Sequence, residues 1–301
     1  MKKIIKKSSL YILILLFILI SSYQPPDITG KGTPENPFVI YSFSGLEKIG
    51  NPQDKYPLDA NYVLGNDIDA QPTAENHYNQ GQGWQPIASS ENPFQGKIDG
   101  QNYEILNLNI NLPRGEIIGL FARTKGAVIK NLGLRNIKII GKEYVGGLTG
   151  INSGTISNSY VQGKIKSKFI SGGLAGWNFA GQIENSHFEG QVKGKLLLGG
   201  LTGRSSSGKI LHSKVKGQIT GDDRNIGGLT GDNTVYSTIE DSHVEGKITG
   251  YERIGGLAGL NNGTINNSQF QGQVKGDWLT DSLVGWSPEG TIENSQGEEV
   301  Q

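Results

Sequence analysis

The chain has 301 residues, of which 45 are glycine and none is cysteine, and its 28 basic residues equal its 28 acidic residues. The absence of cysteine excludes disulfides and cysteine-bound metals. The balanced charge is unlike the basic composition of proteins that bind nucleic acid, so we expect no nucleic-acid partner.

Residues 1–22 have the layout of a secretory signal peptide. Four lysines lie among the first seven residues, and an apolar run of eleven residues extends from Leu10 to Ile20. A membrane-spanning helix usually needs about 20 apolar residues, so the run is short for one. We expect removal of this segment and no stable membrane span afterwards, with an uncleaved anchor as the alternative. The remainder would carry 24 basic and 28 acidic residues.

Residues 23–118 are predicted to form an N-terminal capping segment. Ser44 to Glu47 resembles a helix capping box, and Gly50 is a stop signal. The short helix would cover a sheet edge that otherwise invites aggregation. Asp67 and Asp69 lie close enough in sequence to bind calcium together. The fuller spacing of a calcium loop is missing, so a capped turn is the favoured interpretation.

From residue 119 to residue 297 one pattern recurs. Its clearest copies begin GGLTG or GGLAG, and the leading leucines follow each other at intervals of 26 to 28 residues. These leucines are Leu120, Leu148, Leu174, Leu201, Leu229, Leu257 and Leu283. A fixed interval of this size is typical of a solenoid. Residues 298–301 would form a C-terminal tail.

Within each copy, apolar and polar residues alternate, as Ile156, Val161 and Ile165 do with their polar neighbours. This alternation predicts strands with one buried face. Equivalent positions in successive copies form four apolar columns, which would stack into one elongated core. We therefore predict an all-β fold, a right-handed parallel β-helix of about six to seven coils stacked about 4.8 Å apart. Asn158 and Asn185 belong to a further column that is typical of a stacked turn.

The spacing from the leading leucine to the next core isoleucine varies between 8 and 10 residues. The variation falls at one corner, around Asn152, Asn178, Ser205 and Asn233. In solenoids, insertions of this kind mark loops on one face, which is often the binding face.

The unit GGLxGxN-x-G-x-I-x-N-S resembles the GLUG repeat of bacterial exported proteins. The resemblance covers residues 119–297 and recurs in register, and GTPENPFVI (32–40) and FQGKIDGQNYEILNL (94–108) resemble the segment that often precedes such repeats. The resemblance implies a parallel β-helix-like fold on a secreted or surface protein, adhesin-like in some members and attached to peptidase domains in others. No separate catalytic module is visible in this sequence.

Five side chains are candidate ligand contacts. Trp177 and Trp286 follow the glycine of their repeats, at a position that holds arginine or aspartate in other copies, so we expect it to be exposed. An exposed tryptophan can stack on a sugar or anchor an interface. Tyr160, His187 and His243 share another column that is predicted to point outward. A solvated row without function is the alternative there, and two coils between the histidines argue against a shared metal.

Two chemical interpretations of the sequence have less support. The stretch GGLTGINSG lacks the lysine and the following helix of a phosphate-binding loop. A carbohydrate-active enzyme would need paired carboxylates, or carboxylates with a basic group, on one face. The candidates for such a rim are Asp222, Asp223, Asp232, Asp241, Arg224 and Arg253.

We therefore predict a bacterial, secreted or cell-surface, non-enzymatic β-solenoid that presents an extended binding surface. Its expected partner is a glycan or a cell-surface protein, as for an adhesin. We assign no catalytic residue, cofactor or metal, and calcium is retained only as an alternative. A polysaccharide lyase or hydrolase is the alternative function, by analogy of fold alone. A spacer in a larger surface assembly is the third.

Overall fold

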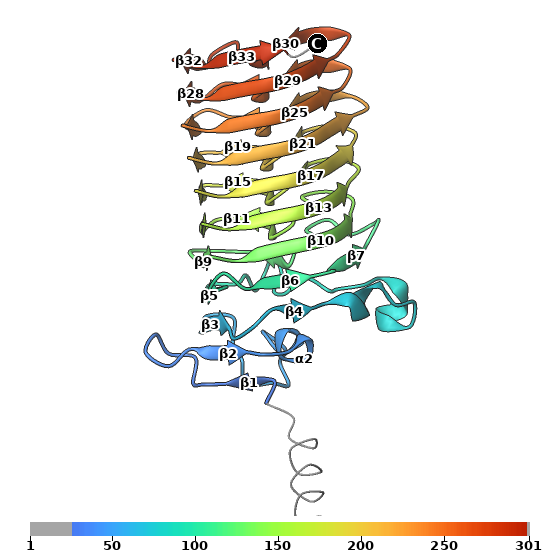
Figure 1. The fold of residues 1–301 in the computed structure, drawn as a ribbon, viewed down its shortest axis with the longest axis vertical. Helices are drawn as coiled ribbons and strands as arrows, with labels where there is room; N and C mark the ends of the chain where they lie inside the picture. The colour runs from blue at the N-terminus through green and yellow to red at the C-terminus, as the bar shows by residue number, and fades with distance from the viewer. Residues whose placement is uncertain (1–25, 300–301) are drawn as a thin grey trace, which may run out of the picture.

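The computed structural model describes residues 26–299 and is a parallel β-solenoid of about ten turns (Figure 1). The predicted signal segment, residues 1–22, lies outside the described residues. Four sheets run along the solenoid, which we call sheets A to D. One full coil passes from sheet D through sheets C and A to sheet B, as residues 171–194 do.

Sheet A is the longest and has eleven strands. All of its pairs are parallel except the first, in which β1 and β2 are antiparallel. Its strands are β1 (Ile28–Thr29), β2 (Phe38–Ile40), β3 (Asn61–Leu64), β5 (Lys97–Asp99), β9 (Val128–Lys130), β12 (Thr155–Ser157), β16 (Gln182–Glu184), β20 (Lys209–Leu211), β24 (Thr238–Glu240), β28 (Thr264–Asn266) and β32 (Thr291–Glu293).

Sheet B has the longest strands. They are β4 (Ile68–Asp69), β6 (Glu104–Leu106), β7 (Asn109–Asn111), β10 (Gly133–Ile140), β13 (Tyr160–Lys166), β17 (His187–Gly194), β21 (Lys214–Gly221), β25 (His243–Thr249), β29 (Gln269–Lys275) and β33 (Gln296–Glu299). Both β6 and β7 pair with β10, so two short strands of one coil lie beside one long strand of the next.

Sheets C and D complete the cross-section. Sheet C consists of β8 (Phe121–Arg123), β11 (Thr149–Asn152), β15 (Ala175–Phe179), β19 (Thr202–Ser206), β23 (Thr230–Asn233), β27 (Ala258–Asn261) and β31 (Val284–Trp286). Sheet D consists of β14 (Ser171–Gly172), β18 (Leu198–Gly199), β22 (Arg224–Gly227), β26 (Glu252–Gly255) and β30 (Trp278–Asp281).

The expectation of six to seven coils was too low. Strands β2, β3 and β5 of the N-terminal segment pair in parallel with one another and then with β9. The segment therefore already winds as a solenoid before the regular repeats begin. Its coils lack the GGL signal, so the repeat count alone could not include them.

The predicted apolar columns form the core. The leading leucines Leu148, Leu174 and Leu201 are fully buried, as are Ile156 and Ile183 of the second column. A further column follows sheet D and includes Val145, Leu198, Ile226 and Ile254. Each coil buries little apolar surface alone, so the stability of the fold comes from stacking neighbouring coils.

The asparagine column is a stacked left-handed turn, as predicted. Asn158 and Asn185 have φ of 48° and 47°, and His212 and Asp241, which replace asparagine in two other copies, adopt the same conformation. A serine follows each of these residues and fixes the next corner. For example, the Ser186 amide donates to the Ser213 hydroxyl of the next coil at 3.2 Å.

The N-cap of the helix in the capping segment lies two residues before the predicted one, Ser44. Helix α2 spans Phe43–Glu47, and its N-cap is Ser42, whose hydroxyl accepts from the Gly45 amide. Leu46 is fully buried. Two 3₁₀ helices, η1 (Gln71–Ala74) and η2 (Tyr78–Gly81), occupy the loop that follows β4.

Candidate functional site

The row predicted from Tyr160, His187 and His243 lies where the sheet B strands begin. Lys214 stands in register between the two histidines, so they are two coils apart. The rings of Tyr160 and His187 stack with centroids 5.0 Å apart and an interplanar angle of 6°. The structure thus brings two of the three predicted side chains together.

Electrostatics set the protonation of this stacked pair. Burial and the hydrogen bond from the Tyr160 hydroxyl to Glu104 raise the pKa of Tyr160 to about 12. Burial lowers the pKa of His187, with Lys214 acting in the same direction and Glu189 against it. Both rings are therefore neutral at pH 7 and pack as uncharged aromatic surfaces.

Next to this row, a groove runs along sheet B from β13 to β29. One stretch, of about 410 Å³, crosses β13, β17 and β21, and the next, of about 590 Å³, crosses β21, β25 and β29. The two stretches share Lys216, Gly217 and Gln218. The floor consists of the glycines Gly163, Gly190, Gly217, Gly246 and Gly272, which are in register.

The glycines of the floor are required by the backbone. Gly217 has φ +159°, and a Cβ there would lie 2.0 Å from the carbonyl oxygen of Gly190 in the preceding coil. The outward residues on either side are exposed or half-buried, and they are glutamine, glutamate and lysine. The groove therefore has glycine backbone along its floor and hydrogen-bonding side chains along both of its walls.

Sequence reasoning missed this groove, although its signal is present. Every regular copy has a glycine two residues after the third core position, as in VQGKI (161–165) and FEGQV (188–192). The residues before and after the glycine both point outward, as alternation along a strand requires, so the glycine takes an inward-parity position between two core residues without adding an apolar side chain. The predicted contacts Trp177 and Trp286 stand at positions that differ between copies, whereas this glycine is constant.

The two tryptophans that were predicted to contact a ligand lie on sheet C, apart from the groove. Trp177 stacks on Tyr144 at 5.6 Å and lies 6.0 Å from the Arg204 guanidinium, and its indole N–H donates to the Ser206 hydroxyl at 3.0 Å. Trp286, which is 40 % exposed, stands 4.3 Å from the Arg253 guanidinium. Both rings thus contact side chains of the protein itself.

The column of Trp177 and Trp286 is exposed in only some of the coils. Ile151 and Asp232, which occupy equivalent positions, are each only 7 % exposed. Strands of sheet D pack closely against this part of sheet C, since a Cβ at Gly231 would lie 2.6 Å from the carbonyl oxygen of Asn225 in β22. Acceptance of a charged residue was therefore a poor guide to exposure.

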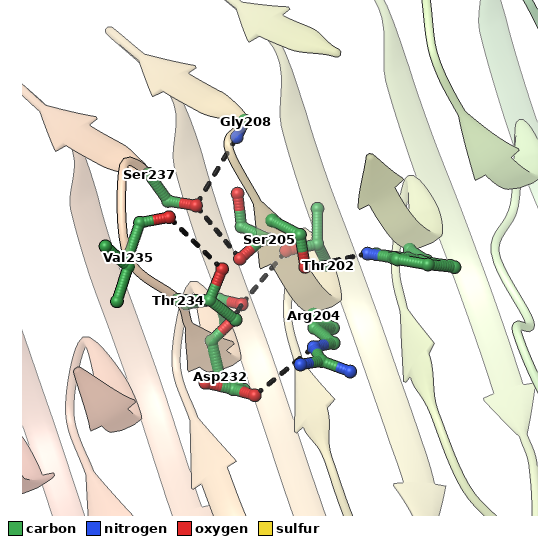
Figure 2. Close-up of polar contacts among 11 residues, drawn as sticks. Thr202, Arg204, Ser205, Gly208, Asp232, Thr234, Val235 and Ser237 are labelled. Atoms are coloured by element: carbon green, nitrogen blue, oxygen red, sulfur yellow. Dashed lines mark hydrogen bonds and ion pairs between the residues drawn. The ribbon is translucent and has the colours of Figure 1, made fainter. Parts of the chain in front are cut away.

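Arg204 and Asp232 explain how a charge is accommodated there. They are register partners on β19 and β23, with Arg204 Nε 3.4 Å from Asp232 Oδ2 (Figure 2). Burial raises the pKa of the Asp232 carboxyl, and Arg204 opposes this only in part. Asp232 Oδ1 has no hydrogen-bond partner within residues 26–299.

The four residues predicted to lie in the loop at the variable corner are buried. Asn152, Asn178, Ser205 and Asn233 are at most 1 % exposed and belong to an internal ladder. Asn152 Nδ2 donates to Asn178 Oδ1 at 2.9 Å, and Asn233 Nδ2 donates to Asn261 Oδ1 at 2.7 Å. The inserted residues follow the ladder, where Thr234 and Ser237 border the turn in Figure 2.

The acidic residues considered for catalysis are distributed over separate corners of the coil. Asp223 precedes sheet D and pairs with Lys195, and Asp232 lies on sheet C. Asp241 follows sheet A and lies 3.3 Å from His212. They do not form the paired rim that glycoside chemistry requires.

The two aspartates considered for calcium accept hydrogen bonds from backbone amides, one on the neighbouring strand β6 and one within the turn. Asp67 Oδ1 accepts from the Glu104 amide, and Asp69 Oδ1 accepts from the Gln71 amide, each at 2.9 Å. This is the geometry of the capped-turn interpretation. Elsewhere in the capping segment, an open pocket of about 610 Å³ lies between the end of α2 and residues 84–92. A second pocket of about 610 Å³ adjoins it and shares Gly50, Asn51, Pro52, Leu58 and Asn92.

Comparison with known proteins identifies the repeat. Residues 141–166 match the family described as the GLUG motif. The chain carries the GLUG motif. Halomucin of Haloquadratum walsbyi is 36 % identical over 152 residues, which is 49 % of this chain and 2 % of halomucin. A protein of Evansella cellulosilytica named "Putative Gly-rich membrane protein" is 33 % identical over 141 residues, 44 % of this chain and 15 % of that protein.

Solved structures resemble the GLUG solenoid in fold. A "putative immunoglobulin A1 protease" from Bacteroides ovatus aligns with a TM-score of 0.56 and 19 % identity, over 89 % of this chain and 76 % of that one. A structure named "IgA1 Protease" aligns with a TM-score of 0.63 and 20 % identity, over 84 % and 21 %. At such identity the likeness concerns the fold. Between residues 26 and 299, no helix has the length and hydropathy needed to cross a membrane.

Proposed function

We propose that this protein is an exported or cell-surface, non-enzymatic β-solenoid that binds a glycan or another surface partner through sheet B. The observation that carries the proposal is the groove over the glycine floor, which continues across five strands. A regular linear groove suits a repeating linear ligand, because each coil presents nearly the same groups again. The stacked Tyr160 and His187 border the same face and could contact the flat face of a sugar.

The relatives support a surface location. One is named a halomucin and the other a Gly-rich membrane protein, and this chain spans a small part of each. The N-terminal lysines and apolar run are consistent with export. Trp177 and Trp286 remain secondary candidates on sheet C, because their rings already contact Tyr144, Arg204 and Arg253.

An enzymatic role is the second candidate, since both solved neighbours carry protease names. The candidate acids Asp223, Asp232 and Asp241 occupy separate corners, which favours binding over catalysis. Incubation of the purified protein with a panel of polysaccharides, with and without calcium, and with immunoglobulin A1 tests this alternative. Turnover of any of them would replace the binding proposal with an enzymatic one.

Binding is tested by screening the purified protein on immobilised glycans and bacterial surface polysaccharides. We expect retention of at least one linear glycan and a weakened interaction when Gln191 and Gln218 of the groove wall are replaced by alanine. Gln182→Ala on sheet A is the matched control and should leave binding unchanged. A protein that retains no glycan and no surface extract would refute the proposal and favour a spacer role.

A further inference from the structure

The middle of sheet B, from β10 to β29, concentrates positive charge, although the whole chain is formally neutral. Its six regular strands, β10 to β29, carry two acidic residues, Glu189 and Glu245, and nine basic ones. All nine are exposed. They are Arg135, Lys138, Lys164, Lys166, Lys193, Lys214, Lys216, Lys247 and Lys275.

The charge is divided unevenly by the glycine floor. On the side where the strands begin, both glutamates stand among the basic residues, and Lys216 pairs with Glu245 at 3.0 Å. On the side where the strands end, the outward positions hold six lysines and no acid. We call this side the lysine bank, which consists of Lys138, Lys164, Lys166, Lys193, Lys247 and Lys275.

Some lysines of the bank are direct neighbours in register. Lys138 pairs with Lys164, and Lys166 pairs with Lys193, on strands about 4.8 Å apart. Like charges placed directly opposite each other on a sheet destabilise it. Within residues 26–299, no lysine of the bank makes an ion pair. The fold therefore bears a repulsion that a bound polyanion would relieve.

We propose that the groove binds a linear acidic polysaccharide with carboxylate or sulfate groups along its length; this rests on the binding function proposed above. The polymer lies along the glycine floor, with its anionic groups over the lysine bank and its hydroxyls against the glutamines of the walls. The groove spans four coil spacings, or about 19 Å. Lysine suits this role, because its flexible ammonium can follow charges that are not fixed in position.

The groove lining favours a polysaccharide over a nucleic acid. Proteins that bind single strands stack bases on aromatic side chains, whereas the lining consists only of glycine, glutamine, glutamate and lysine. Glutamine amides both donate and accept hydrogen bonds, which matches sugar hydroxyls. Tyr160, His187 and His243 lie outside the lining, at the beginning of the strands.

The test is titration calorimetry of the full chain with polygalacturonate, chondroitin sulfate, uncharged dextran and single-stranded DNA. We expect binding of at least one acidic polysaccharide, none of dextran, and weaker binding as salt rises. The variant Lys164→Gln/Lys166→Gln/Lys193→Gln should bind at least tenfold more weakly. Its melting temperature should not fall, because the substitutions remove like-charge neighbours.

The matched control is Lys97→Gln/Lys125→Gln/Lys209→Gln, which removes three exposed lysines outside sheet B. Its affinity should equal that of the unmodified protein. Equal weakening in both variants, or dextran bound as tightly as the acidic polymers, would overturn the inference while the binding function stands. Tighter binding of DNA would also overturn it. If the protein retained no glycan in the screen above, the proposed function would fall with it.

Discussion

The interrupted asparagine ladder shows how single residues shape this solenoid. Asn178 and Asn233 flank Ser205, whose shorter side chain reaches neither neighbour, so Asn233 Oδ1 is buried without a donor. In the intact rungs each Nδ2 donates to the next Oδ1. We predict that Ser205→Asn restores the rung and stabilises the protein by about 1 kcal/mol. Chemical denaturation measures this, and Ser205→Ala, which removes the unpartnered Ser205 hydroxyl but supplies no amide, should leave Asn233 Oδ1 without a donor and give a smaller gain.

The buried carboxyl of Asp232 lowers the stability of the fold by an amount that can be measured. Because its folded pKa is raised, the carboxyl favours the fold when protonated, and this contribution is lost as pH rises through the raised value. We predict that Asp232→Asn gains about 1 kcal/mol at pH 8 and less at pH 4. Thermal unfolding at the two pH values checks this, with Asp277→Asn, at an exposed position, as the control. A gain independent of pH would exclude the carboxylate as its cause.

At the scale of elements, the glycine floor fixes how closely the sheet B strands pass one another. Gly217→Ala would place a methyl group against the Gly190 carbonyl, in a conformation that alanine avoids. We predict a loss of more than about 3 kcal/mol. Gly126→Ala is the comparison, since Gly126 also has positive φ but nothing within 4 Å, so its loss should be about 1 to 2 kcal/mol. Equal losses in denaturation would show that backbone conformation alone governs both sites.

The elements also show what sequence alone can predict. Leu148, Ile156 and Val161 recur in register, and burial of apolar columns forces them inward, so the fold was predictable. The exposure of the position that accepts different residue types was not predictable, because Ile151 and Asp232 are buried where sheet C passes close to sheet D. The lysine bank could not be predicted from the net charge. Net charge sums over all four sheets, whereas the stacking of coils brings lysines from separate repeats together on sheet B.

At the scale of the whole molecule, the solenoid is nearly one-dimensional. Each strand of sheet B pairs only with its neighbours above and below, as β17 does with β13 and β21. Stability should then be a sum of coil and interface terms, and a local defect should be felt mainly by adjacent coils. The same property lets the groove lengthen with each added coil without changing its cross-section.

Two buried phenylalanines of one column test this view. Phe188 lies in the middle of the array and Phe270 near its end, and both are at most 2 % exposed. Replacing either with alanine should cost about 3 to 5 kcal/mol locally. We predict that Phe270→Ala accelerates hydrogen exchange in β25, β29 and β33 and leaves β10 unchanged, whereas Phe188→Ala accelerates it in β13, β17 and β21. Uniform acceleration along the whole chain in both variants would mean that the solenoid unfolds as a single cooperative unit.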